Sequence, residues 1–360
     1  MTELGDGTRC VHAGLADPVP GTPLLASPVF GTGYHLGHPS YGYGRADNPT
    51  WRALEEAIGS LDGGECVVFP SGMAAISAVL RTCEGRLVLP SDGYFVTRSY
   101  VQSELPWLEV VEVPTAGPWP SFDGVGLVLL ETPSNPGLDV CDITALAAEA
   151  HAAGALLAVD NTTATPLGQR PLQLGADFAV ASDTKALAGH SDVVLGHVTC
   201  SDPALAARIR ESRTFSGSVP GPFETWLAHR GLGTLDLRLA RQAANASAVY
   251  KVLSSAPGVT GLRWPGAPED PSHALAARQM RRFGGVLTFC LPSAAHVDRF
   301  LAASSLVTGA TSFGGLHSTA DRRAQWGDPV PEGLVRLSAG CEDTEDLVAD
   351  IRTALSTLDT

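Results

Sequence analysis

The chain of 360 residues is long enough to bury a large core and to form more than one domain. Hydrophobic residues make up 44% and charged residues 17% of it, which is the composition of a well-buried globular protein and excludes a disordered one. A formal net charge of -14 argues against nucleic acid and anionic membranes as partners, and any anion site must therefore gather positive groups locally.

The cysteines and the N-terminus indicate the compartment. Seven cysteines are scattered without any CxxC spacing, which favours reduced thiols over a disulfide framework or a zinc site, so no metal is expected. The first residues lack the apolar segment of a signal peptide, and no apolar stretch approaches the ~20 residues that span a bilayer. We expect a cytoplasmic protein.

The first fifty residues are rich in glycine and proline and show little helical periodicity. They predict an extended arm with turns. Asn48-Pro49-Thr50 is a helix start signal, and apolar residues then recur at helical spacing until Gly63-Gly64.

Short apolar runs then alternate with helical stretches, such as 72–83 and 142–153. Unbroken apolar strands separated by helices indicate an α/β fold with a mainly parallel sheet covered on both faces, whose ligands lie at the carboxyl ends of the strands. The predicted strands are 66–69, 86–89, 108–113, 125–130, 155–159 and 178–181.

The remainder predicts a different organisation. Residues 222–255 indicate one long helix, and a mixed pattern follows, typical of a smaller α+β domain. We expect an N-terminal arm over 1–50, a large domain over 51–245 and a C-terminal domain over 246–360. The mixed pattern consists of helices near 271–281, 294–303 and 344–357 and strands at 285–290 and 334–338.

Several catalytic motifs are absent. The chain has no GxxxxGK[ST], HExxH or GxSxG motif, and no GxGxxG follows a strand, which argues against a dehydrogenase. The polar residues at the strand ends must therefore be interpreted one by one.

The turn Ser71-Gly72-Met73 follows a predicted strand and opens a helix. The N–H groups of Gly72 and Met73 would favour an anion at this helix N-terminus. Taken alone, an ordinary serine cap explains the pattern better.

Two charged residues also follow apolar strands. Asp160 needs a partner for its charge, and in a pyridoxal phosphate site that partner is the protonated ring nitrogen. Lys185 ends the run Ser182-Asp183-Thr184-Lys185, and a partly desolvated lysine can form an imine and move protons. Ser182 and Thr184 could offer hydroxyls to a phosphate. A cap for Asp160 and a structural role for Lys185 explain each residue equally well in isolation.

Tyr94 and Asn135 follow two other strands. Tyr94 could stack on a flat ring, although a tyrosine at the rim is at least as plausible, and turn chemistry explains the Asn-Pro pair equally well. Together, these residues place an anion-binding turn, an acid, an aromatic ring, an amide and a lysine at the ends of successive strands, in an order and spacing that are hard to obtain by accident.

In these residues the chain resembles the trans-sulfuration enzymes of cysteine and methionine metabolism, which include cystathionine γ-lyase and cystathionine γ-synthase. The resemblance runs nearly from end to end and implies the fold type I architecture of pyridoxal phosphate enzymes, similar to aspartate aminotransferase, with a seven-stranded sheet. The matching blocks lie at 8–14, 43–50, 71–75, 131–136, 159–162, 182–185, 189–193, 222–235 and 335–340.

The resemblance implies roles for the residues that hold the cofactor. Lys185 would bind it as a Schiff base, Asp160 would pair with its ring nitrogen, and Tyr94 would stack on the ring and assist in deprotonating the incoming amine. Its phosphate would be bound by Gly72, Met73, Ser182 and Thr184.

The resemblance also implies a shared site and a substrate grip. Tyr43 and Arg45 would reach the phosphate from a neighbouring subunit, in a homotetramer built of two dimers. Arg336 would grip the substrate α-carboxylate as a bidentate fork, helped by Asn135 and the Ser318 backbone.

Three positions depart from the family pattern. Phe95 and Val96 stand where methionine γ-lyases carry Gly and Cys, which weakens the case for that activity. His317 replaces a glutamate found near the far amino group of cystathionine in related enzymes. His317 could accept a hydrogen bond from that group when neutral, or it could be a structural residue of the wall.

The expected activity is γ-elimination on L-cystathionine, a small-molecule sulfur amino acid. The alternatives are γ-replacement, by a cystathionine γ-synthase or an O-acylhomoserine sulfhydrylase, then methionine γ-lyase and, remotely, a non-catalytic protein that binds pyridoxal phosphate.

Overall fold

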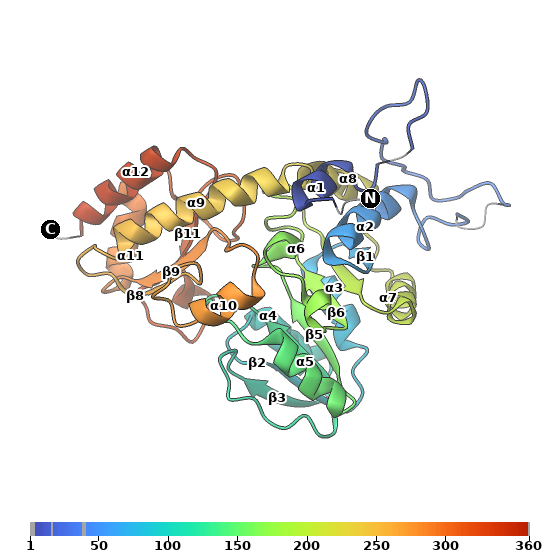
Figure 1. The fold of residues 1–360 in the computed structure, drawn as a ribbon, viewed down its shortest axis with the longest axis horizontal. Helices are drawn as coiled ribbons and strands as arrows, with labels where there is room; N and C mark the ends of the chain where they lie inside the picture. Colours follow the sequence, from blue (N-terminus) through green and yellow to red (C-terminus); the bar gives the residue numbers. More distant parts are fainter. Residues whose placement is uncertain (1–3, 16, 38–40, 359–360) are drawn as a thin grey trace.

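The computed structural model describes residues 4–15, 17–37 and 41–358, and it contains two β-sheets with helices packed against both (Figure 1). The larger sheet has seven strands in the order β1-β7-β6-β5-β4-β2-β3, which confirms the predicted α/β architecture. Its strands are β1 (Glu65–Phe69), β2 (Arg86–Pro90), β3 (Glu109–Val113), β4 (Val125–Glu131), β5 (Leu156–Asp160), β6 (Phe178–Ala181) and β7 (Gly196–Cys200).

Strand β7 is the element of this sheet that the sequence pattern missed. It runs antiparallel to both neighbours, β1 and β6, whereas the pairs from β6 to β3 are parallel. His197 and Thr199 interrupt its apolar pattern although all five residues of the strand are buried. A strand buried on both faces can carry polar side chains only when partners satisfy them.

The two faces of the larger sheet carry separate cores, because successive side chains of a strand point to opposite faces. Val67 and Phe69 of β1 belong to a core shared with α3, α4 and α7. Cys66 and Val68 of the same strand belong to a core shared with α2 and α8, and α5 covers the far end of the sheet. The helices are α2 (Pro49–Asp62), α3 (Gly72–Leu80), α4 (Phe95–Glu104), α5 (Ile143–Ala152), α6 (Thr165–Gly168), α7 (Pro203–Ser216) and α8 (Pro222–Leu232).

The smaller sheet has the strand order β10-β11-β12-β9-β8 and lies beside α9, α11 and α12 (Figure 1). Its core contains Val249, Phe289, Phe300, Val335 and Ile351. Its elements are β8 (Thr260–Arg263), α10 (His273–Gln279), β9 (Val286–Cys290), α11 (Ala294–Ala303), β10 (Thr308–Gly309), β11 (Thr319–Arg322), β12 (Leu334–Ser338) and α12 (Thr344–Ser356).

The predicted long helix over 222–255 consists of two helices, α8 and α9 (Leu235–Leu253). The chain bends at Gly233-Thr234. Just before the bend, a Cβ on Gly231 would lie 2.4 Å from the Ala188 carbonyl oxygen. This close contact with the loop after Lys185 requires a glycine. The proposed boundary between residues 245 and 246 falls inside α9.

One face of α9 contacts three loops through residues three or four positions apart. Arg238 donates to the carbonyls of Ala186 and Leu187. Gln242 donates to the carbonyls of Gly314 and Gly315, and Asn245 to those of Gly340 and Glu342. The loops that α9 holds in this way come from both sheets.

The N-terminal segment differs from the extended arm that its composition predicted. Residues Asp6–His12 form α1, which lies against α2 and α9 and is anchored by an ion pair of 2.5 Å between Asp6 and Arg170. Residues 17–37 contain no helix and no regular strand and extend away from the sheets (Figure 1). Residues 1–3, 16, 38–40 and 359–360, which belong to the predicted arm and C-terminal domain, lie outside the described residues.

All seven cysteines are free thiols. Within the described residues, none of the helices combines the length and the apolar character needed to cross a bilayer.

A buried ion pair joins α7 to α2 at the edge strand β1 of the larger sheet. Arg213 is 1% exposed, donates to Glu55 at 2.7 Å and to the Val68 carbonyl at 3.0 Å, and lies over the Trp51 ring. Breaking one partner of such a pair leaves an uncompensated charge in the core.

We therefore expect Arg213→Met to lower the free energy of unfolding by about 3–5 kcal/mol. Arg210→Met on the same helix is the control, because Arg210 pairs with a Glu65 side chain that is 45% exposed and should contribute less than about 1 kcal/mol. Urea unfolding followed by circular dichroism measures both, and equal losses would contradict the assignment.

Candidate active site

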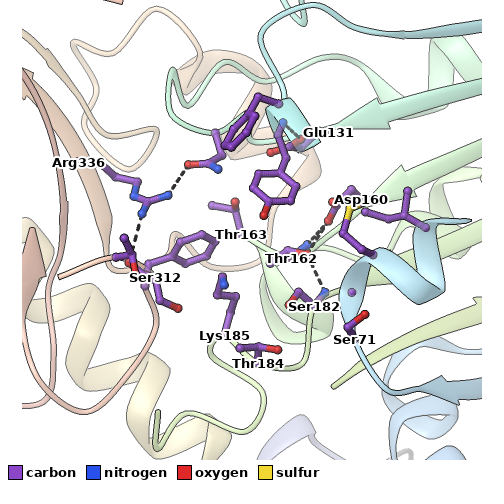
Figure 2. Close-up of a pocket in the computed structure, with 18 of the residues that line it drawn as sticks. Ser71, Glu131, Asp160, Thr162, Thr163, Ser182, Thr184, Lys185, Ser312 and Arg336 are labelled. Carbon is purple, nitrogen blue, oxygen red and sulfur yellow. Dashed lines mark hydrogen bonds between the residues drawn. The ribbon is translucent and has the colours of Figure 1, made fainter. Parts of the chain in front are cut away.

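A cavity of ≈ 530 Å³ lies at the carboxyl ends of the parallel strands and is closed on its other side by loops of the smaller sheet (Figure 2). Its size is that of a typical small-molecule site. It is lined by Ser71, Gly72, Met73, Ile76, Tyr94, Phe95, Glu131, Asn135, Asp160, Thr162, Thr163, Ser182, Thr184, Lys185, Val194, Thr311, Ser312, Phe313, Arg323, Trp326 and Arg336.

The N-terminus of α3 opens into this cavity. Ser71 caps the helix by accepting a hydrogen bond from the Ala74 N–H at 3.1 Å. A Cβ on Gly72 would lie 2.6 Å from the Ser182 Cβ, so only glycine lets the turn approach the segment before Lys185. Backbone N–H groups of a helix N-terminus beside serine and threonine hydroxyls form an environment suited to a phosphate.

Asp160 ends β5 and lies opposite Glu131 of β4 in the sheet register. The hydroxyl and the N–H of Thr162 both donate to the Asp160 Oδ1, at 2.5 and 3.0 Å. Burial raises the pKa of Asp160, while the Thr162 hydrogen bonds and the positive charge of Lys185 lower it. The site therefore favours a cation beside this carboxylate, because a cation would offset the cost of burying its charge.

Lys185 projects into the cavity between Thr184 and Ser312 (Figure 2). Burial lowers the pKa of its ammonium group, Arg336 lowers it further, and Asp160 raises it. The Nζ lies 5.6 Å from the centre of the Phe313 ring. These surroundings lower the cost of forming the neutral amine, which is the form that reacts with a carbonyl and accepts a proton.

Tyr94 is held beside Asp160 by a carboxyl group that the sequence did not single out. The Tyr94 N–H donates to the Glu131 Oε2 at 2.6 Å. Burial is the largest cause, and the charge of Asp160 the second, of a pKa of Glu131 well above its usual value. Burial also raises the pKa of the Tyr94 hydroxyl, and Phe95 packs edge-on against its ring at 5.5 Å.

Arg336 enters the cavity from β12. Its guanidinium donates to the Asn135 Oδ1 at 2.7 Å and to the Ser312 carbonyl at 3.3 Å (Figure 2), and it lies 3.3 Å from the Asp321 carboxylate. Burial lowers the pKa of Arg336 to about 10, with Asp321 opposing the shift. The group is thus a buried cation at neutral pH, suited to a carboxylate ligand.

Arg323 and Trp326 are among the lining residues that gave no distinct signal in the sequence. Arg323 is buried and pairs with Asp321 and Asp328 at 2.9 and 2.5 Å. The adjacent Arg322 instead pairs with Glu332 near the surface. Nothing in the sequence alone distinguishes the inward arginine from the outward one.

The structure brings most of the predicted residues together in the cavity, but Ser318 and His317 lie outside it. Ser318 is buried, and both its N–H and its hydroxyl donate to Glu342, so its backbone does not face the cavity. His317 is exposed and, like Val96, is not part of the lining. The predicted help to Arg336 comes instead from Ser312, six residues earlier, because the turn at 313–315 carries the chain away from the cavity.

Tyr43 and Arg45 are also absent from this cavity. Both are exposed, and Arg45 donates to the Thr214 carbonyl at 2.8 Å and lies over the Tyr43 ring.

The cavity fits pyridoxal phosphate. The Gly72 turn brings a helix N-terminus close to Ser182, where a phosphate would find backbone and hydroxyl donors, Asp160 favours a cationic ring nitrogen, and Lys185 supplies an amine of lowered pKa. These three groups match the phosphate, the ring nitrogen and the aldehyde of the cofactor.

Several known proteins are similar to this chain in both sequence and structure. A Streptomyces coelicolor protein named "Putative cystathionine gamma-lyase" is 54% identical over 98% of this chain and 93% of that protein. A Mycobacterium tuberculosis cystathionine gamma-synthase is 38% identical over 98% of this chain and 97% of that protein. The crystal structure of a Xanthomonas oryzae pv. oryzae cystathionine gamma synthase in complex with cystathionine superimposes with a TM-score of 0.94 at 33% identity, over 99% of each chain.

The profile of one family, described as Cys/Met metabolism PLP-dependent enzyme, matches residues 8–356, which include every strand of both sheets and every residue of the cavity lining. The chain therefore belongs to this family of enzymes and uses pyridoxal phosphate as its cofactor.

Proposed function

We propose that the protein is a carbon–sulfur lyase that carries out γ-elimination on L-cystathionine, with water as the second reactant and with cysteine, 2-oxobutanoate and ammonia as products. The observation that carries the proposal is the placement of Lys185, Asp160 and Arg336 around one cavity. The relative that is 54% identical is named "Putative cystathionine gamma-lyase", which supports elimination over replacement.

Arg336 and Asn135 bind the α-carboxylate of the substrate and thereby fix the position of its Cα. Their own hydrogen bond of 2.7 Å already holds the guanidinium toward the cavity. The positive charge of Arg336 also lowers the pKa of the Lys185 amine. The residue that binds the substrate therefore prepares the residue that reacts with it.

Lys185 holds the cofactor and, once released, accepts the proton from Cα. Pyridoxal phosphate, when bound, supplies the electron sink for the carbanion at Cα. Asp160 keeps the ring nitrogen protonated, and Thr162 holds that carboxylate in place. Tyr94 covers the ring and assists in deprotonating the substrate amine, while Gly72, Met73, Ser182 and Thr184 bind the phosphate.

Removal of a second proton at Cβ then lets the γ-thiolate leave. Lys185 would first pass the Cα proton on to the bound cofactor, which returns its amine to the neutral form. Because burial lowers the pKa of this amine, we assign Lys185 to the removal of the second proton as well.

The second candidate is γ-replacement, by a cystathionine γ-synthase or an O-acylhomoserine sulfhydrylase. Relatives named as cystathionine gamma-synthases cover nearly the whole chain, and both reactions use the same catalytic residues. Phe95 in the cavity wall disfavours methionine γ-lyase, and the intact set of reactive residues disfavours a non-catalytic protein.

We also propose a cytoplasmic homotetramer in which Tyr43 and Arg45 complete the phosphate site of a neighbouring subunit. The segment that precedes them exposes large apolar side chains, with Leu24 94%, Phe30 68% and Leu36 93% exposed. Large apolar side chains exposed together on one segment are consistent with an interface.

The activity is tested by supplying the purified protein with cystathionine alone and, separately, with an acylated homoserine plus cysteine. We expect 2-oxobutanoate from cystathionine to form faster than cystathionine forms in the second reaction. Lys185→Ala should abolish the visible absorption of the bound cofactor and lower turnover about 10³-fold or more. A faster second reaction would establish the replacement enzyme instead.

Arg336→Lys should raise KM for the amino acid substrate by about 10- to 100-fold, because one ammonium group cannot replace a bidentate guanidinium. The control is Arg322→Lys on the adjacent strand, whose partner Glu332 lies at the surface. Steady-state kinetics of both variants decide the assignment, which fails if KM rises equally in both or in neither.

Shared sites predict complementation between subunits. Mixed assemblies of Arg45→Ala and Lys185→Ala chains should regain about a quarter of wild-type activity, since half of the dimers are mixed and each mixed dimer keeps one intact site. Lys185→Ala mixed with Arg336→Ala should stay inactive, because these residues line one cavity of one chain. Absence of recovery in the first mixture would rule out the shared site.

A further inference from the structure

Three titratable side chains form a closed cluster directly behind the cavity. Asp62 ends α2, His197 lies on β7, and Asp183 lies between Ser182 and Lys185. The His197 Nδ1 is 2.6 Å from the Asp183 Oδ1, and its Nε2 is 3.2 Å from the Asp62 Oδ2. All three side chains are at most 2% exposed, and none of them lines the cavity.

Both ring nitrogens of His197 therefore face carboxylates, which act as acceptors. Burial alone would lower the pKa of His197, but Asp183 and Asp62 raise it to about 10. The Thr199 hydroxyl gives Asp62 a further donor at 2.6 Å. Among the described residues, His197 is the side chain that pairs with Asp183, through the Asp183 Oδ1. The other carboxylate oxygen of Asp183, Oδ2, is buried without a hydrogen bond.

The segment 182–185 is held at each of its first three residues. The Ser182 N–H donates to the Thr162 hydroxyl at 2.9 Å. Thr184 and Leu195 are joined through the Thr184 hydroxyl, at 3.2 and 3.1 Å. The contact between Asp183 and His197 lies between these two anchors and fastens the segment to β7.

The same stretch of β7 supports the phosphate turn. A Cβ on Gly196, the residue before His197, would lie 2.6 Å from the Ser71 carbonyl oxygen. The backbone next to His197 thus contacts the turn at 71–72, and its side chain holds the residue two positions before Lys185. A displacement of His197 would move both groups that we assign to the cofactor.

We propose that His197 is a positioning residue, which acts through its hydrogen bond to Asp183 to fix the segment that carries Lys185 against the floor of the cavity. The proposal rests on the assigned role of Lys185 and concerns cofactor binding, so it does not depend on which sulfur amino acid is the substrate.

Two substitutions of His197 separate this bond from the charge of the ring. In His197→Asn the amide nitrogen occupies the position of Nδ1 and still reaches Asp183. In His197→Gln it occupies the position of Nε2 and reaches Asp62 instead. Both variants lose the same positive charge, so each is the control for the other.

The readouts are the affinity of the apoenzyme for pyridoxal phosphate and the pH titration of the visible absorption band of the lysine-bound cofactor. We expect His197→Gln to bind pyridoxal phosphate about tenfold more weakly and to shift the midpoint of the titration. His197→Asn should stay within about threefold of the wild-type affinity. Two equally impaired variants would make the charge, and not the bond, responsible and would overturn the proposal, as would two variants with wild-type cofactor binding.

If His197→Gln does not fold, Asp183→Ser is the deciding variant, because it removes the same bond and leaves His197 paired with Asp62. Asp177→Asn is its matched control, since Asp177 pairs with His151 at 2.9 Å at the amino ends of the parallel strands, away from the cavity. Asp183→Ser should weaken cofactor binding and Asp177→Asn should not, and equal effects would overturn the proposal. A wild-type protein without a lysine-bound cofactor would refute the assignment of Lys185 itself, which is a separate result.

Discussion

The site depends on keeping a buried lysine near a buried carboxylate without letting them close into an ion pair. A direct pair between Lys185 and Asp160 would stabilise both charges, protonate the amine and fill the space needed for the cofactor. The structure avoids this by giving each group other neighbours. Thr162 holds Asp160 with two hydrogen bonds, while Lys185 lies toward Phe313 and the positive charge of Arg336.

The positive charge of the buried Arg336 guanidinium must in turn be compensated by negative charge nearby. Asp321 supplies it but lies closer to Arg323 than to Arg336, at 2.9 against 3.3 Å. Arg323 and Asp328 complete a cluster of two arginines and two aspartates. Since Arg323 engages Asp321 more closely, the Arg336 guanidinium keeps hydrogen-bonding capacity for a ligand carboxylate.

Local patterns in the sequence predicted the parallel strands and the residues at their ends well. Apolar runs of four to six residues and turn residues after them are local signals. Asp160 is the last residue of β5, and Lys185 lies in the turn that follows β6. Strand β7 escaped prediction because His197 and Thr199 are satisfied by Asp62 and Asp183, which are distant in the chain. Glu131 and Arg323 were missed as site residues for the same reason, since only tertiary contacts show which charged side chains turn inward.

The loop after β10 shows the limit of transferring roles by spacing. Ser312 and Ser318 are similar residues in the same stretch of chain, yet only Ser312 lines the cavity. The positive φ values of Ser312 and Gly314 turn the chain sharply between them. Assigning the role by motif position selected Ser318, which lies on the far side of this turn, instead of Ser312, which lines the cavity.

The contacts of α9 have a consequence for the length of substrate that the cavity accepts. Arg238, Gln242 and Asn245 hold the loop after Lys185, the loop after Phe313 and the loop after Arg336 on one rigid helix. The amine to which we assign the proton transfer and the guanidinium to which we assign carboxylate binding are therefore both held, through their loops, by a single helix. In the proposed reaction, a fixed separation of these two groups would select a substrate by its amino acid end and not by the length of its side chain.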